Sequence, residues 1–357
     1  MSRIAVVTSS PPFGDGGHLV IARSLVTALR CAGHEADLVT TPSHRWGRQA
    51  RAYVATRLTD VTHDQDGRPI DQVISLRYPS YAVRHPSHVC WLNHRMREYY
   101  DLWPAFVATL GPAGRVKERL RRTMIRRVDR YLLTRNVTRV VAQSKTIQER
   151  LQRFGAVPSD VLHPPAPQRA YRCEGYGDYL FAVSRLTPLK RMDLLIEALA
   201  LSEARGIRCV IAGTGEEGSR LLRLVRNRGL ESRVTLIGPV DSAQLVDHLA
   251  RCRAVCFLPH AEDYGFVTVE AFSAAKAVIT CTDSGGPTEL VEVGVTGLIS
   301  EPRPERVAVA IARIMDDRAL AERLGAAALK KSETMTWPAA VERLLVAQGP
   351  GSPGADI

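Results

Sequence analysis

The stretch that decides the fold is residues 4–40, IAVVTSSPPFGDGGHLVIARSLVTALRCAGHEADLVT. It begins with a short apolar run at residues 4–8 and continues through a loop, Gly14-Asp15-Gly16-Gly17. Helical spacing follows over residues 20–32, and a second apolar run occupies residues 36–40. A strand, a helix and a second strand of these lengths predict a βαβ unit with parallel strands.

The same alternation of strands and helices continues along the chain. Further strands are predicted at residues 72–76, 89–92, 137–142, 179–183, 207–212, 234–237, 254–258 and 277–281. The likeliest linker is the Pro-rich stretch at residues 163–167 together with the polar segment at 171–178. We therefore predict an α/β protein with two facing Rossmann-like domains, at residues 1–168 and 169–335, and a disordered tail at 349–357.

Composition narrows the class of protein. Of the 357 residues, 45% are hydrophobic and 24% are charged, as in globular proteins, which excludes a wholly disordered chain. No apolar run has the length of a membrane span, and the N-terminus lacks the apolar core of a signal peptide. The seven scattered cysteines form no CxxC pair, so we expect reduced thiols and a cytoplasmic protein.

Charge is distributed unevenly between the two halves. Residues 1–170 carry a balance of +13, whereas residues 171–357 carry −2, which together give the net charge of +11. Such a surplus suits nucleic acid, an anionic membrane surface or phosphorylated ligands. The asymmetry indicates two domains with different tasks.

The densest basic run lies between Arg115 and Arg130 and has the spacing of an amphipathic helix. Its apolar residues recur every four positions and therefore share one helical face. They are Val116, Leu120, Met124, Val128 and Leu132. Two interpretations stay open: a helix that packs on its own domain and keeps its arginines in water, or a surface that approaches anionic lipid or a phosphorylated acceptor.

Two motifs suggest other chemistry but lack its context. Residues 213–218, GTGEEG, match the dinucleotide-binding GxGxxG pattern, but Glu216 and Glu217 would stand where a pyrophosphate meets the positive end of a helix. We interpret this motif as a glycine turn between a strand and a helix. Asp64 and Asp66 resemble the DxD metal site of some sugar transferases, but they lie in a turn with no apolar strand before it, so we predict no metal.

The stretch with the most chemistry is residues 257–271, FLPHAEDYGFVTVEA, in which a strand ends, a loop carries Glu262, and a helix opens with Glu270 in its first turn. Backbone N–H groups at a helix start bind anions. Here they belong to Gly265, Phe266, Val267 and Thr268. The two glutamates could accept hydrogen bonds from a hydroxyl-rich ligand on either side of a diphosphate. Taken singly, each could instead be an ordinary loop acid or an acid favoured by the helix dipole.

With Gly265, Phe266 and Val267 between them, Glu262 and Glu270 resemble the donor-site signature of glycosyltransferase family 4, the retaining nucleotide-sugar transferases of GT-B fold. The resemblance runs from about residue 4 to residue 345. Near the start, Pro12, Asp15, Gly16 and Gly17 are similar to the family's glycine-rich loop, placed here on the donor side. Trp91-Leu92-Asn93-His94-Arg95 resembles the segment that brings a histidine, His94, to the sugar.

Further motifs of the family occur in the second half. Arg185 and Lys190, followed by Arg191, resemble the basic pair that holds the donor diphosphate. Two cations at a strand end can neutralise a departing diphosphate. The alternative, a solvated charged turn, suits Arg191 better than the other two. Gly238 and Val240 correspond to the loop near the base, residues 283–289 to another loop of the donor domain, and residues 336–348 to a terminal helix that crosses back to the first domain.

The resemblance implies a GT-B architecture with a deep inter-domain cleft, and retaining transfer of a sugar from a UDP- or GDP-sugar to an acceptor hydroxyl. Arg185 and Lys190 would hold the diphosphate. Glu270 would bind the ribose and Glu262 the sugar, and the backbone carbonyl of His94 would stabilise the reacting centre. The leaving phosphate would take the acceptor proton, without a metal or a cofactor.

Two rival functions are weighed against this one. A nucleotide-sugar epimerase of the same fold would leave the Glu262 and Glu270 signature unexplained. A nucleic-acid-binding protein would need stacking aromatics, which make up only 6% of the chain. We expect as partners a nucleotide sugar and a hydroxyl acceptor that is anionic or membrane-associated, and no nucleic acid. The helix from Arg115 to Arg130 would allow peripheral contact at the inner face of the membrane.

Overall fold

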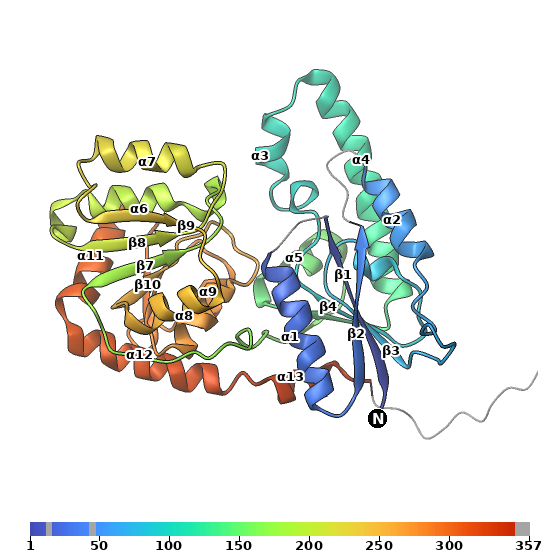
Figure 1. Cartoon of the computed structure of the whole chain (residues 1–357). Helices are drawn as coiled ribbons and strands as arrows, with labels where there is room; N and C mark the ends of the chain where they lie inside the picture. Colours follow the sequence, from blue (N-terminus) through green and yellow to red (C-terminus); the bar gives the residue numbers. More distant parts are fainter. Residues whose placement is uncertain (12–15, 43–47, 347–357) are drawn as a thin grey trace, which may run out of the picture. The chain divides into compact units, whose positions relative to one another are not determined.

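The structure is a computed structural model, and it describes residues 1–11, 16–42 and 48–346. The chain forms two compact units: unit 1 comprises Met1–Pro164 and Trp337–Ile357, and unit 2 comprises Pro165–Thr336 (Figure 1). Each unit is built on one six-stranded sheet whose neighbouring strands are all parallel. The α/β class predicted from the alternating pattern is confirmed.

The sheet of unit 1 has the strand order β2-β1-β3-β4-β5-β6. Its strands are β1 (Arg3–Ser10), β2 (Glu35–Pro42), β3 (Gln72–Ser75), β4 (His88–Leu92), β5 (Arg139–Ala142) and β6 (Asp160–Val161). Strands β3 and β4 are buried along their whole length. Burial on both faces is typical of parallel sheets covered by helices, and here it includes the polar residues Gln72, Ser75 and His88.

Helices cover both faces of this sheet. They are α1 (Gly17–Cys31), α2 (Gln49–Leu58), α3 (Trp103–Ala108), α4 (Pro112–Tyr131), α5 (Lys145–Gly155) and α13 (Trp337–Leu344). Although α13 comes last in the chain, it belongs to unit 1: Gln72 donates from Nε2 to the Leu344 carbonyl at 2.8 Å, and the Trp91 and Trp337 rings meet edge to face. Within the described residues, no helix is long and apolar enough to cross a membrane.

The sheet of unit 2 has the order β12-β11-β10-β7-β8-β9. Its strands are β7 (Tyr179–Val183), β8 (Arg208–Ala212), β9 (Val234–Gly238), β10 (Ala254–Cys256), β11 (Val278–Cys281) and β12 (Gly297–Ser300). The longer helices are α6 (Met192–Leu199), α7 (Gly218–Asn227), α8 (Ser242–Arg251), α9 (Phe266–Ser273), α11 (Pro304–Asp316) and α12 (Arg318–Glu333), with the short α10 at Gly286–Leu290. From β7 the chain adds β8 and β9 on one side, and it then returns to add β10, β11 and β12 on the other side, so the switch point lies between β7 and β10. Doubly wound sheets bind ligands outside the carboxyl ends of the strands at such a switch point.

One buried histidine ties the stability of unit 1 to pH. His88 on β4 is fully buried, and its Nε2 lies 2.8 Å from the Ser75 hydroxyl on β3. Burial lowers the pKa of His88 to about 3, and the nearby His85 and Arg57 act in the same direction. In the unfolded chain a histidine titrates near pH 6.5. The folded protein therefore keeps His88 neutral through a range in which the unfolded chain takes up a proton.

We predict that His88→Gln flattens the acid side of the stability profile. Between about pH 6 and pH 4 the unfolded wild type holds one more proton than the folded wild type. As the pH is lowered through this range, the free energy of unfolding of the wild type therefore falls by about 1.4 kcal/mol per pH unit relative to that of the variant. Urea unfolding at several pH values measures this difference. Parallel profiles for the two proteins would contradict the assignment.

Candidate functional site

Unit 2 gathers most of the predicted residues at the carboxyl edge of its sheet. Arg185 follows β7, and Glu262 lies in the loop that leaves β10 for α9. Lys190 ends a short 3-10 turn, η4 (Pro188–Lys190). Because β7 and β10 are the strands that flank the switch point, these loops lie where a ligand of such a sheet would bind.

Lys190 and Glu262 form an ion pair through Nζ and Oε2. Both side chains are mostly buried, and Nζ also lies 5.5 Å from the centre of the Phe257 ring. The cation predicted to hold a diphosphate therefore neutralises the acid predicted to hold a sugar. The structure brings together these two residues, which are 72 positions apart in the chain.

The loop that contains Glu262 is held in place by backbone contacts with residues 283–286. The Glu262 N–H donates to the Ser284 carbonyl at 2.8 Å, and the Gly286 N–H donates to the Glu262 carbonyl at 2.9 Å. Gly285 has a φ of +72°, and a Cβ there would lie 2.4 Å from the Glu262 carbonyl oxygen. Only glycine allows this approach, so one role of the 283–289 motif is to position Glu262.

The start of α9 differs from the prediction. Helix α9 begins at Phe266, after Gly265 at φ +86°, so Glu270 lies in the second turn instead of the first. The favourable dipole effect on an acid is strongest in the first turn of a helix. The placement of Glu270 therefore requires another cause.

That cause is an ion pair with the segment that joins the two units. Arg169 and the Tyr171 hydroxyl both donate to Oε1 of Glu270, the hydroxyl at 3.1 Å. Glu270 is 6% exposed, and burial raises the pKa of its carboxyl while the charge of Arg169 acts in the opposite direction. Both contacts go to one carboxylate oxygen, and a carboxylate has acceptor positions on two.

The backbone amides at the start of α9 are not equivalent. The Thr268 N–H donates to the Gly265 carbonyl at 2.9 Å. Helix geometry leaves Phe266 and Val267 without an intrahelical acceptor, so theirs are the amides that could hold an anion. Within the described part of the chain, the buried Thr268 hydroxyl also has no hydrogen-bond partner.

A solvated turn was expected for Arg191 sooner than for Arg185, and the structure shows the reverse. Arg191, for which a solvated turn seemed the better alternative, binds both carboxylate oxygens of Asp283 at 2.7 and 2.8 Å and also donates to the Leu258 and Pro259 carbonyls. Partial burial raises the pKa of Asp283, but hydrogen bonds and charge from Arg191 and His260 outweigh it, so the net pKa is lowered. Arg185, by contrast, is exposed and makes no side-chain ion pair with any described residue.

The glycines of the GxGxxG motif serve a close approach of loops. A Cβ on Gly213 would lie 1.8 Å from the Ser184 carbonyl oxygen, and one on Gly215 would lie 2.2 Å from that of Leu186. The Gly213 N–H donates to the Gly238 carbonyl at 2.7 Å. The loops after β7, β8 and β9 are thus bound together, and Val240 follows two residues after Gly238, just before α8.

The predicted residues of unit 1 lie in two places. Gly16 and Gly17 form the start of α1, where the Gly16 carbonyl accepts from the Leu19 N–H at 2.9 Å, whereas Pro12 and Asp15 lie outside the described residues. His94 follows β4, and its Nδ1 lies 2.9 Å from the Arg95 carbonyl oxygen. The His94 carbonyl, predicted to face a reacting centre, accepts from the Tyr78 N–H at 3.2 Å.

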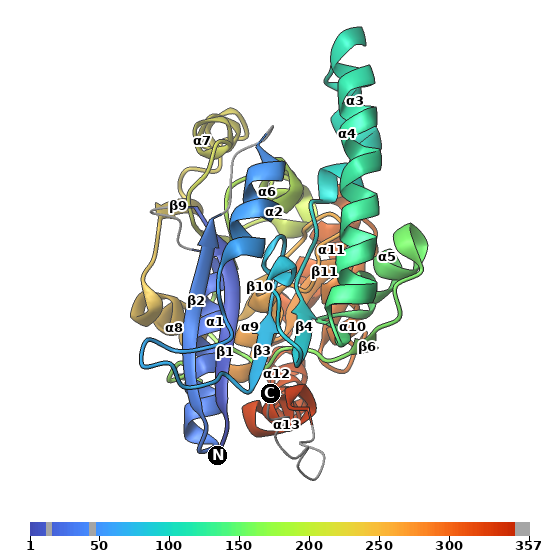
Figure 2. The same cartoon turned by 90° about the vertical axis from the view of Figure 1, so that its right-hand side faces the viewer.

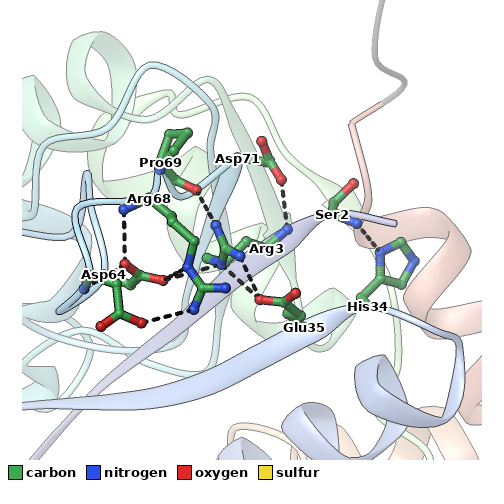
Figure 3. A network of polar contacts seen from close by, with 9 residues as sticks. Ser2, Arg3, His34, Glu35, Asp64, Arg68, Pro69 and Asp71 are labelled. Carbon is green, nitrogen blue, oxygen red and sulfur yellow. Dashed lines mark hydrogen bonds and ion pairs between the residues drawn. The ribbon is translucent and has the colours of Figure 1, made fainter.

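Both aspartates of the DxD-like pair form ion pairs with arginine side chains (Figure 3). Asp64 contacts Arg68 at 2.9 Å and Arg3 at 3.5 Å, and Asp66 contacts Arg68 at 3.2 Å. Arg3 also pairs with Glu35, so this network joins the beginnings of β1 and β2 to the turn before β3. These contacts give the two aspartates a structural role.

A separate hollow of about 500 Å³ lies at the amino ends of β4 and β5. Its basic lining residues are Arg57, Arg84, His85 and Arg135. Since α1 begins at the carboxyl end of β1, this hollow is at the opposite edge of the sheet from Gly16 and Gly17. It contains none of the predicted site residues.

Sequence reasoning missed Arg169 and Tyr171, and it gave no role to two residues inside motifs that it had singled out. These are His260, in the stretch at residues 257–271, and Asp283, in the loop at residues 283–289. Arg169 and Tyr171 lie in or beside the predicted linker, about 100 positions from the glutamate that they bind. No local spacing connects such partners. The single signal was the presence of an arginine and a tyrosine directly after a Pro-rich stretch.

Comparison with known proteins defines the class of unit 2. Residues 174–331 match the family model of the group 1 glycosyl transferases. A D-inositol 3-phosphate glycosyltransferase of Kineococcus radiotolerans is 30% identical over 233 residues, which cover 56% of this chain and 53% of that protein. Most of unit 2 therefore matches the group 1 glycosyl transferases, in agreement with the predicted resemblance. The chain spans about half the length of this relative.

Solved structures define the fold of the chain as a whole. Sucrose-phosphate synthase from Thermosynechococcus elongatus matches with a TM-score of 0.75 at 18% identity, over 96% of this chain and 97% of that one. HepE of Anabaena, solved in complex with UDP and glucose, matches with a TM-score of 0.68 at 17% identity, over 96% and 98%. The predicted GT-B fold is confirmed.

We predict that Gly213→Ala destabilises unit 2 more than Gly229→Ala does. Both glycines have positive φ values, +129° and +64°, but a Cβ on Gly229 meets nothing within 4 Å. The positive φ alone costs about 1 kcal/mol, whereas the clash at Gly213 adds roughly 1–3 kcal/mol through displaced backbone. Thermal and urea unfolding of both variants measure the difference. Equal losses would show that the loops after β7 and β8 can separate freely.

Proposed function

We propose that this protein is a retaining glycosyltransferase that moves a sugar from a UDP- or GDP-sugar to an acceptor hydroxyl. The observation that carries the proposal is the cluster of paired acids and bases at the switch point of unit 2, within the part of the chain that matches the group 1 family. The HepE structure, with its UDP, supports a nucleotide as the ligand of this fold. The activity and its substrates are proposals because the named relative is matched over only half of its length.

The paired side chains suggest how a donor would bind. Lys190 would exchange its contact with Glu262 for the diphosphate, joined by exposed Arg185 and the amides of Phe266 and Val267. Cations and N–H groups placed there stabilise the negative charge that develops as the glycosidic bond breaks. Loss of its partner frees Glu262 to accept hydrogen bonds from the sugar hydroxyls.

Glu270 would bind the ribose without giving up its internal partners. Arg169 and Tyr171 hold Oε1, so the second oxygen, Oε2, would accept from the ribose hydroxyls. The Arg169 charge opposes the rise in pKa that burial causes and so favours the ionised carboxylate, which can accept hydrogen bonds from hydroxyl donors. Gly238 and Val240 would lie beside the base, and His94, with Gly16 and Gly17, would serve the sugar side.

We further propose that the reaction needs neither a metal nor a cofactor and that the leaving phosphate takes the acceptor proton on the same face of the sugar. The acceptor would be anionic or presented on an anionic surface, in keeping with the positive balance of residues 1–170. The protein would act in the cytoplasm. An epimerase is less favoured, because the relative and the family model carry the names of glycosyltransferases.

We predict that Lys190→Ala and Glu270→Ala each lower kcat/KM for nucleotide-sugar turnover by about 100-fold or more, since each removes a charge-assisted contact to the donor. Glu270→Gln, which keeps the size of the side chain, should also be impaired, and it covers the case in which the alanine variant fails to fold. Turnover is measured as nucleoside diphosphate release with each candidate donor.

The Lys331–Glu292 pair provides the matched controls. Lys331 and Glu292 form an ion pair elsewhere in unit 2, so Lys331→Ala and Glu292→Ala remove comparable charges without touching the site. Both controls should retain wild-type turnover. Near-normal activity of a folded Lys190 or Glu270 variant would refute the site assignment, and an epimerised sugar formed from donor alone would favour the epimerase.

A further inference from the structure

Helix α4 buries its two acids together with Ile125, and it exposes a row of other apolar residues. Asp129 is fully buried and accepts hydrogen bonds from the hydroxyls of Tyr53, Tyr81 and Tyr100, the last at 2.6 Å. About three turns earlier, buried Glu118 accepts from the Tyr99 hydroxyl at 2.8 Å. The packing face of the helix therefore combines two hydrogen-bonded acids with one apolar residue, Ile125.

The opposite side of α4 carries the apolar stripe seen in the sequence. Val116 is 60% exposed, and Leu120 and Met124 are each 67% exposed. Val128 and Tyr131 continue the stripe and are also exposed, whereas Leu132, the last residue of the predicted row, is buried. An isolated exposed apolar residue is ordinary, but a contiguous row along one helix face marks an interaction surface.

Cations flank this stripe without any compensating acid. Within α4, the exposed charged residues are Arg115, Lys117, Arg119, Arg127 and Arg130, while Glu118 and Asp129, the acids of the helix, are both buried. Three- and four-residue spacings relate these cations to the stripe or to one another, and all five side chains are exposed. We call the exposed apolar residues and these five cations the outward face.

The orientation of α4 is fixed by its buried acids. A rotation that buried the apolar stripe would withdraw Asp129 from three tyrosine hydroxyls, and buried donors left without an acceptor are unfavourable. Burial raises the pKa of Asp129, and the tyrosine hydrogen bonds oppose that rise. In both views α3 and α4 project beyond the sheet of unit 1, so a flat partner could reach the outward face (Figures 1 and 2).

We propose that the outward face of α4 docks on an anionic lipid bilayer. Lipid phosphates would contact the five cations, and the row from Val116 to Val128 would enter the boundary between headgroups and acyl chains. A second copy would bring two cationic faces together, and a nucleic acid would leave the apolar row in water. A bilayer satisfies both features. This proposal does not depend on the glycosyltransferase activity.

The test is sedimentation of the full chain with vesicles of phosphatidylcholine alone or with about a third phosphatidylglycerol. We expect binding to the anionic vesicles only. Arg119→Glu with Arg127→Glu should weaken it about 25-fold or more, from roughly fivefold for each cation. Leu120→Gln with Met124→Gln, which keeps every charge, should weaken it about tenfold or more.

A control of equal charge change lies in unit 2. Arg306 and Arg313 are exposed on α11, and replacing both with Glu alters the net charge by the same amount, so this variant should bind as wild type does. Equal loss in the control would show attraction by net charge alone and would overturn the proposal. The proposal would also be overturned if the wild-type protein did not bind anionic vesicles. Two further results would overturn it: a dimer in light scattering that the α4 variants abolish, or displacement of the protein from the vesicles by duplex DNA.

Discussion

A buried carboxylate must find hydrogen-bond donors inside the protein, and this constraint shapes both units. In unit 1, Asp129 gathers three tyrosine hydroxyls and thereby sets which side of α4 faces the core. In unit 2, Glu270 takes Arg169 and Tyr171 from the segment that enters the unit, and so fixes that segment against α9. Each acid orders a stretch of chain that hydrophobic burial alone would leave undetermined.

The same constraint explains how the charged side chains of the candidate site are stable beside one another. Lys190 and Glu262 neutralise each other, and Arg191 and Asp283 join the loop after β7 to the loop after β11. These pairs differ in what they can do. Arg191 is tied to two backbone carbonyls as well as to Asp283, so it supports the framework, whereas Lys190 has one charged partner that a diphosphate could replace. The geometry thus separates a structural arginine from an exchangeable lysine one residue away.

Much of the fold follows from local patterns in the sequence, because a parallel sheet is built from short apolar runs separated by helices. Strand β7 begins and ends where predicted, and the glycine turn at residues 213–218 is what its two glutamates suggested. The stretch at residues 49–58 is helix α2, and no element is predicted for it above because its amphipathic pattern is weak. The apolar stripe of α4 was visible in the sequence, but its direction was not, because that depends on tyrosines far away in the chain. For the same reason, spacing indicated Lys190 and Glu262 but not their contact with each other, and it did not indicate Arg169 at all.

The central claim is that the carboxyl edge of unit 2 binds a nucleoside diphosphate and its sugar. Titration calorimetry of the full chain with UDP, GDP, their common sugars and NAD addresses it most directly. The account predicts that one of the two diphosphates and at least one of its sugars bind with the affinity usual for enzyme substrates. Binding confined to NAD, or no binding of any nucleotide by the folded protein, would contradict it.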